Sequence, residues 1–182
     1  MPTNYIPFKE TNYFSDFICD YLAEKPELKE FYHRFPKLEN FEAQIKEKSN
    51  SFQSEARNHI TKVLKHQYKN LNTSDLTADN IESLNLENTF TITTGHQLNL
   101  FTGPLYFLYK IISTINLTKQ LKTAYPEYNF VPMYWMASED HDFEEINYFN
   151  FKGKKIQWNS EQTGAVGHFN TEGLDEVFDV IS

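Results

Sequence analysis

The sequence predicts an α/β fold in which a helical region precedes the first part of a parallel β-sheet. In residues 1–88, apolar side chains recur at the spacing of α-helices. The segment TFTITTG (89–95) is rich in β-branched residues and ends on glycine, as a buried strand does. A long helical pattern and a second apolar stretch, YNFVPMYWM (128–136), follow it. Strand, helix and strand in this order predict two parallel strands joined by a right-handed crossover.

The helical region consists of short segments. Residues 12–25 carry one apolar stripe at helical spacing, made of Phe14, Phe17, Ile18 and Tyr21. Pro26 and Pro36 bound a short second helix, and residues 41–71 contain two polar-faced helices. The cap-forming residues of TSDLTADNIESL (73–84) predict one more.

The sheet region, 89–182, is expected to be an incomplete core. In the crossover helix one face is formed by Leu105, Leu108, Ile112 and Ile115. The stretch 128–136 is almost continuously apolar, as in a strand covered on both faces. Residues 147–159 predict a hairpin that turns at Gly153, and residues 172–182 resemble the opening of an amphipathic helix. Two parallel strands make a poor sheet, so we expect this chain to be the front part of a larger domain.

Composition excludes several functional classes. The 182 residues carry a formal net charge of -8, which argues against a broad nucleic-acid or anionic-membrane surface. The single cysteine, Cys19, allows neither an internal disulfide nor a cysteine metal cluster, and its helical stripe predicts a core position. We find no signal peptide pattern and no apolar run long enough to span a membrane. A soluble cytoplasmic protein is therefore expected.

The loop TTGHQLNLFTGP (93–104) predicts an anion site. Thr102 or Gly103 can cap the following helix, and Pro104 is expected at its first position, where a missing N–H costs nothing. Amides of that first turn would then bind a phosphate or carboxylate, and Gly95 and Gly103 would let the backbone approach it. The loop matches no standard nucleotide-binding motif. The alternative to an anion site is therefore a tight strand-to-helix turn that contains glycine and proline for structural reasons.

An acidic block follows the second strand. Glu144 and Glu145 are explained by a solvated helix start capped by Ser138. Four further residues follow Trp135 and Met136, at the opening of the predicted pocket, which we expect to be partly buried. They are Glu139, Asp140, His141 and Asp142. Carboxylates crowded in a low dielectric have raised pKa values and keep a neighbouring imidazole protonated. We therefore predict that this block exchanges a proton or holds an ammonium group.

His96 and Gln97 are predicted to join the same pocket, because the carboxyl ends of neighbouring parallel strands meet at one edge of a sheet. His96 is a candidate for acid–base chemistry or for holding a ligand, and a bond to the backbone is the alternative. Its spacing to the acidic block matches no standard metal motif, so no metal is predicted. The other histidines and Lys110 are assigned to the solvated surface, with a phosphate contact as the alternative for Lys110.

Three segments resemble the BshC family of bacillithiol-biosynthesis, cysteine-adding enzymes. They are TTGHQLNLFTGPLYFLYKIIS (93–113), VPMYWMASEDHDFEEIN (131–147) and TGAVG (163–167). The resemblance is strong across 94–167 and looser through the N-terminal helices. It implies a Rossmann-like core, a coiled coil that mediates homodimers, and chains substantially longer than this one.

The resemblance also implies an activity. A cysteine ligase of this family would join L-cysteine to glucosaminyl malate through an amide bond, with ATP or ADP as the cofactor. The residues that match the family's motifs are then pocket residues. We predict catalytic roles for Asp140, His141, His96 and Asp142, and substrate binding by Gly95, Gln97, Thr102, Gly103, Pro104, Trp135 and Glu139. The alternatives are nucleotidyl transfer on a related fold, and a fragment that binds without catalysis.

Overall fold

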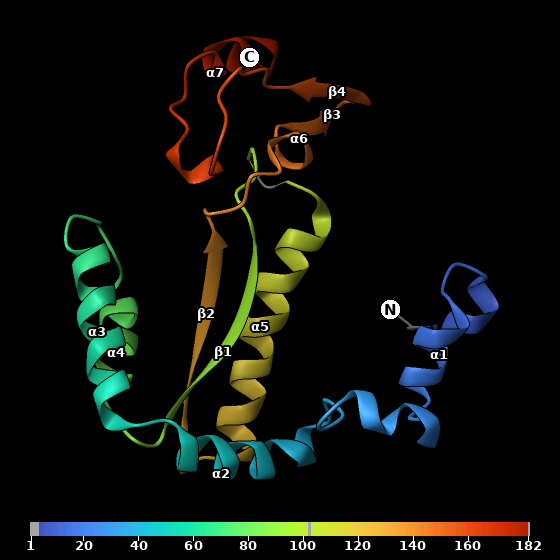
Figure 1. Cartoon of the computed structure of the whole chain (residues 1–182), viewed down its shortest axis with the longest axis vertical. Helices are drawn as coiled ribbons and strands as arrows, with labels where there is room; N and C mark the ends of the chain where they lie inside the picture. The colour runs from blue at the N-terminus through green and yellow to red at the C-terminus, as the bar shows by residue number, and fades with distance from the viewer. Residues whose placement is uncertain (1–3, 102, 182) are drawn as a thin grey trace. The chain divides into compact units, whose positions relative to one another are not determined.

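The computed structural model describes residues 4–101 and 103–181, in two compact units, residues 1–50 and 51–182. Each unit is described here by itself (Figure 1). The helices at 54–68 and 75–83, which the sequence groups with the N-terminal region, fall in the same unit as the sheet. The division into domains 1–88 and 89–182 stays a prediction.

The first unit is built from short helices. They are the 3₁₀ helices η1 (Phe8–Thr11), η2 (Pro26–Phe31) and η3 (Leu38–Asn40), and the α-helices α1 (Asp16–Leu22) and α2 (Phe41–Ser51). The hydroxyl of Ser15 caps α1 by accepting from the Ile18 amide. The segment predicted between two prolines is thus a 3₁₀ helix, followed by a cluster in which the rings of Tyr21, Tyr32 and Phe35 pack together.

In the second unit, α3 (Ser54–Tyr68) and α4 (Asp75–Ser83) pack against each other. Ser74 caps α4 through a bond from the Thr77 amide to its side-chain oxygen, as the sequence predicts. Among the described residues no helix is long and apolar enough to cross a membrane.

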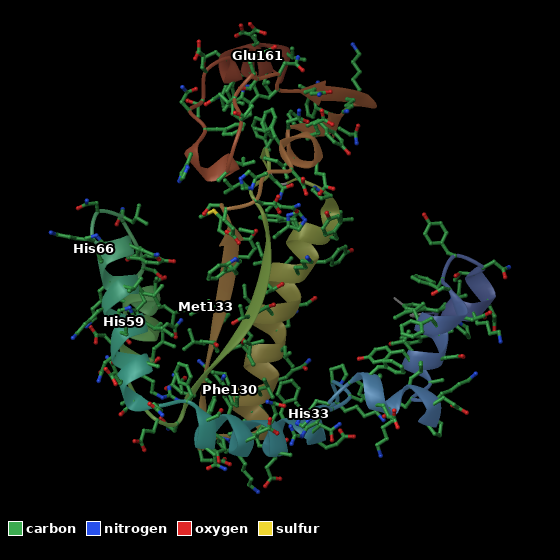
Figure 2. The ribbon with its side chains drawn as sticks, viewed as in Figure 1. His33, His59, His66, Phe130, Met133 and Glu161 are labelled. Carbon is green, nitrogen blue, oxygen red and sulfur yellow. The ribbon has the colours of Figure 1, made fainter. Side chains whose placement is uncertain are left out.

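The strand–helix–strand unit is confirmed. β1 (Thr89–Gln97) pairs in parallel with β2 (Asn129–Ala137), and α5 (Leu105–Ala124) packs on both strands (Figure 1). Both strands begin in a buried region where Phe130 is 1% exposed (Figure 2). β1 extends beyond the predicted glycine to include His96 and Gln97, because these residues continue the ladder opposite Met136 and Ala137.

Burial does not continue along the sheet, and one expectation is wrong for this reason. β2 is not covered on both faces, since the Trp135 and Met136 side chains are 60% and 56% exposed. The crossover helix is present as predicted, and its apolar face is exposed, with Leu105 65% exposed and Ile112 51% exposed. The face of α5 that is covered includes Thr118 and Leu121 instead.

The C-terminal part folds around its own small core. α6 (Phe143–Ile146) leads into an antiparallel hairpin of β3 (Tyr148–Phe151) and β4 (Lys154–Gln157), followed by η4 (Val166–His168) and α7 (Leu174–Ile181). The hairpin turns at Lys152 and Gly153, both with positive φ, as predicted from the glycine. Its core consists of Ile156, Trp158 and Val177.

Candidate functional site

The two polar segments lie at the same edge of the sheet. Parallel pairing places Gly95 opposite Trp135 and Gln97 opposite Ala137. The two strands therefore end at the same edge of the sheet. Beyond the strands, Gln97 Nε2 donates to Glu145 Oε2 at 3.0 Å, and the Leu100 amide donates to the carbonyl of Ile146. Residues nearly fifty positions apart are thereby tied to each other.

His96 is held at both ring nitrogens. The Asn99 amide nitrogen donates to the carbonyl of Gln97 at 2.8 Å, which fixes its orientation, and it lies 2.9 Å from His96 Nδ1. Nδ1 is therefore the acceptor, although the carbonyl of Gln97 lies 3.2 Å from it as well. In this tautomer the proton is on Nε2, which donates to the Tyr106 hydroxyl at 2.9 Å. His96 thus connects the loop to the first turn of α5, and its catalytic role stays a prediction.

Backbone geometry explains both glycines of the loop. A Cβ on Gly95 would lie 3.0 Å from the carbonyl oxygen of Trp135, so a side chain there would push the strands apart. Gly103 has a φ of +55°, and a Cβ would lie 2.7 Å from the Asn99 side chain. Thr102, which directly precedes Gly103, lies outside the described residues.

The start of α5 differs from its prediction by one position. Pro104 is the N-cap with extended backbone, so the helix begins at Leu105 rather than at the proline. The first turn contains no acidic residue, and Lys110 lies one turn further, where its ammonium group donates to the carbonyl of Gly95 at 3.2 Å. The N-terminal end of α5 and this cation together favour an anion at this edge.

Burial at this edge affects one phenol. The Tyr134 hydroxyl donates to the carbonyl of His96 at 3.3 Å, and desolvation raises its pKa above the usual value. Tyr134 is therefore a neutral support for the backbone of β1.

The acidic block is more exposed than predicted. Glu139, His141 and Asp142 are exposed and Asp140 is half-buried, since Trp135 and Met136 themselves face solvent. Among the described residues, the side chains of Glu139, His141 and Asp142 therefore lack the low-dielectric surroundings that were expected for their proton chemistry. The acidic groups remain close together in sequence and at the sheet edge.

The block forms an ordered turn. Asp140 Oδ1 accepts from the Asp142 amide at 2.9 Å, and α6 begins at Phe143, with Asp142 as its N-cap. Ser138 is therefore not the cap, because it lies five residues before the helix. Glu144 and Glu145 do occupy the first turn of α6, as expected.

A segment that the sequence analysis did not connect to the site supports this turn. The Val166 amide donates to the carbonyl of Asp140 at 2.8 Å, and the Gly167 amide donates to the carbonyl of Ser138 at 2.8 Å. Both donors belong to the TGAVG stretch and its η4 turn. The stretch was noticed only through the resemblance, since backbone-to-backbone bonds leave no pattern in the side chains.

The remaining histidines lie on the surface. His33, His59, His66 and His168 are exposed, in agreement with the surface assignment, and Figure 2 shows His59 and His66 on α3. Among residues 4–101 and 103–181, no three His, Cys, Asp or Glu side chains are grouped so as to hold a metal ion. Cys19 is half-buried.

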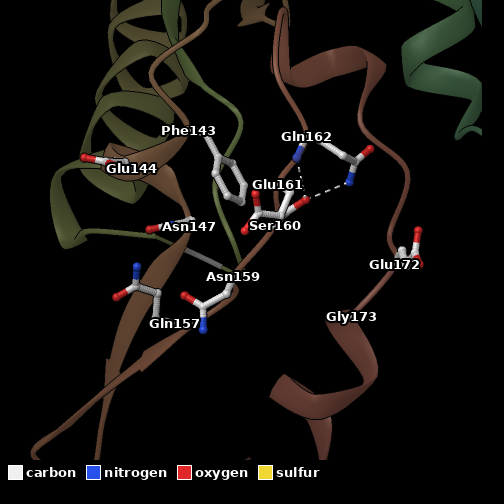
Figure 3. Close-up of a pocket in the computed structure, with 10 residues that line it drawn as sticks. All are labelled: Phe143, Glu144, Asn147, Gln157, Asn159, Ser160, Glu161, Gln162, Glu172 and Gly173. Carbon is white, nitrogen blue, oxygen red and sulfur yellow. Dashed lines mark hydrogen bonds between the residues drawn. The ribbon is translucent and has the colours of Figure 1, made fainter.

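A depression of about 680 Å³ lies beyond the acidic block, between α6, the end of β4 and the following loop (Figure 3). Its walls include Phe143, Asn147, Ser160 and Glu161. None of the predicted site residues that the structure describes lines it. The polar run that follows Trp158 in the sequence is the one signal that could have indicated it.

A parallel strand–helix–strand unit with polar loops at its carboxyl edge is the architecture of an α/β domain of the Rossmann-like type. Across residues 1–182 the chain matches the model of the N-terminal Rossmann-like domain of the bacillithiol-biosynthesis protein BshC. The chain therefore belongs to the BshC family, in the N-terminal Rossmann-like domain. This finding confirms the fold class and the family predicted from the sequence.

Relatives agree with this assignment. The chain is 64% identical to a protein of Flavobacterium johnsoniae over 182 residues, 62% identical to one of Christiangramia forsetii over 186 residues, and 45% identical to one of Cytophaga hutchinsonii over 176 residues. These alignments cover 100%, 100% and 97% of this chain but 34%, 35% and 33% of the relatives. Each relative carries the name "Putative cysteine ligase BshC". This chain thus spans about one third of their length.

Proposed function

We propose that this chain supplies part of the active site of a ligase that joins L-cysteine to the amine of glucosaminyl malate in bacillithiol biosynthesis. Membership of the BshC family supports the reaction class. The observation that carries the location is the 3.0 Å bond between Gln97 and Glu145, which holds the two polar loops at one edge.

The α5 side of the edge fits an anionic group. Its helix N-terminus has no acidic residue in the first turn, and the Lys110 ammonium group lies beside the carbonyl of Gly95. A nucleotide phosphate and a substrate carboxylate share the chemistry that this end would bind. ATP, when bound, would supply the leaving group that activates the cysteine carboxyl.

The acidic side fits an amine. In the proposed step the amine nitrogen of glucosaminyl malate attacks the activated carbonyl carbon of cysteine, and the bond to the activating group breaks. The amine proton passes to Asp140 or His141, two adjacent residues of the turn in which Asp140 Oδ1 accepts from the Asp142 amide. Exposed carboxylates such as Glu139 would hold the ammonium form before the reaction.

The test uses two variants of the intact protein, Asp140→Asn and His141→Ala. We expect each to lower the rate of cysteinyl product formation by about 10²- to 10⁴-fold, the usual contribution of a positioned acid or base. Circular dichroism and thermal unfolding should remain as in the wild type, since neither side chain is buried. Asp175→Asn on α7 is the matched control, because this aspartate is exposed and lies outside both loops. Wild-type rates in both test variants would refute the assignment.

The form of activation is tested separately. Incubation of the intact protein with cysteine, glucosaminyl malate and ATP should release either AMP or ADP in step with the product. Release of AMP would indicate that cysteine is activated as an adenylate. Release of ADP would indicate that it is activated as an acyl phosphate. Product formation without release of either nucleotide would exclude ATP as the energy source.

A further inference from the structure

The depression beyond the acidic block is lined by polar groups suited to a ligand, and its charged lining residues are all acidic. Three carboxylates, Glu144, Glu161 and Glu172, line it, and no lysine, arginine or histidine is among the lining residues. Carboxamides and the Ser160 hydroxyl supply further donors and acceptors (Figure 3). The three carboxylates would repel an anion, whereas hydroxyl groups and ammonium groups would find acceptors.

Asn147 carries a buried acceptor that the fold does not use. The residue is 3% exposed and lines the depression, and its Oδ1 has no hydrogen-bond partner among the described residues. A buried unpaired oxygen costs about 1–3 kcal/mol, so its presence calls for a reason. Because Asn147 lines the depression, a donor group of a bound ligand is a candidate partner for this oxygen.

The opposite wall is preorganised. Gln162 donates to the Ser160 hydroxyl at 3.0 Å and to the carbonyl of Asn170 at 3.2 Å, while its oxygen accepts from the Asn170 amide at 2.9 Å. Trp158 Nε1 donates to the carbonyl of Glu172 at 2.9 Å. The loop from 158 to 172 is therefore cross-linked by its own hydrogen bonds, and the ring of Phe143 adds an apolar surface to the lining of the depression.

We propose that this depression binds a small polyhydroxylated molecule that is neutral or positively charged, with Asn147 and Glu161 as its principal contacts. A ring such as a sugar would place hydroxyl groups against the carboxamides and carboxylates and a C–H face against Phe143. The volume of about 680 Å³ is sufficient for such a ligand. The inference rests on this depression alone and does not depend on the proposed ligase reaction.

The experiment measures calorimetric binding of three probes to the intact protein: glucose, 6-amino-6-deoxyglucose and glucose 6-phosphate. The probes share one ring and differ in charge at one carbon. We expect the amino sugar to bind about tenfold or more tightly than the phosphate, with glucose between them and the difference reduced by salt. Equal affinities for all three, or binding of none, would overturn the proposal.

Two variants separate a ligand contact from a structural role. Asn147→Leu should abolish binding of glucose and of the amino sugar while leaving the melting temperature unchanged or higher, because an unpaired buried group is removed. Glu161→Gln should remove most of the preference for the amine and leave glucose binding near its original affinity. Glu176→Gln, an exposed change on α7 outside the depression, is the control. Wild-type binding by Asn147→Leu together with a lower melting temperature would show that Asn147 is purely structural and would overturn the assignment.

Discussion

Arg57 is a buried cation whose guanidinium group binds three backbone carbonyl oxygens. The side chain donates to the carbonyls of Leu84, Glu87 and Thr89 at 3.2, 3.2 and 2.8 Å, and its group lies over the ring of Phe90. Burial lowers the pKa of Arg57 from its ordinary value, although the group remains charged at any physiological pH. Arg57 thereby links α3 to the end of α4 and the start of β1.

Replacing Arg57 by methionine should lower the free energy of unfolding of the intact protein by about 2–4 kcal/mol. The substitution leaves three carbonyl oxygens without their donor at a site where water has little access. Urea unfolding, with an unchanged slope, measures the loss. Arg57→Lys should recover only part of it, since an ammonium group lacks the planar fork. Lys62→Met on the same helix should stay within about 0.5 kcal/mol, and a similar result for Arg57→Met would contradict the role assigned here.

At the level of elements, the η4 turn fixes the acidic block through contacts that tolerate no side chain. A Cβ on Gly167 would lie 2.6 Å from the Cβ of Ser138 and 2.8 Å from its carbonyl oxygen. The φ of Gly167 lies outside the left-handed region, so the constraint is one of space.

Gly167→Ala should therefore displace the Ser138–Asp142 turn and reduce activity more than stability. A shift of about 1 Å at reacting groups can cost about 100-fold in rate, and we expect a loss of at least tenfold in cysteinyl product formation. Initial rates and thermal unfolding of the intact protein are the two measurements. Thr163→Ala in the same stretch is the control, because its side chain is exposed. An unchanged rate for Gly167→Ala would show that the turn does not depend on η4.

The elements that the sequence predicts correctly are those determined by the local periodicity of apolar residues and by capping and turn residues. Ser74 before α4 and Gly153 in the hairpin are examples, since caps and tight turns depend on one or two residues. The extent of β1 was missed because pairing with β2, and not local composition, keeps His96 and Gln97 in the ladder. Asn147 and Arg57 were missed because burial of a polar group depends on the tertiary neighbours that surround it.

For the whole molecule, the main discrepancy is an apolar surface on α5. Leu105, Tyr109 and Ile112 are 65%, 61% and 51% exposed, although a helix that is apolar on both sides is typical of a buried position. The relatives are about three times as long as this chain, and we expect this face to be covered in the intact protein.

Ile112→Ala distinguishes a covered face from an exposed one. If the face is covered in the intact protein, the lost burial and the cavity should lower the free energy of unfolding by about 2–4 kcal/mol, measured in urea. On a solvent-exposed helix the same change should be neutral or slightly stabilising, because alanine is the better helix former. Asn116→Ala, at an exposed polar position of the same helix, gives the baseline. A result for Ile112→Ala equal to that baseline would mean that the stripe faces water in the intact protein, and the expectation of a larger core around α5 would then be wrong.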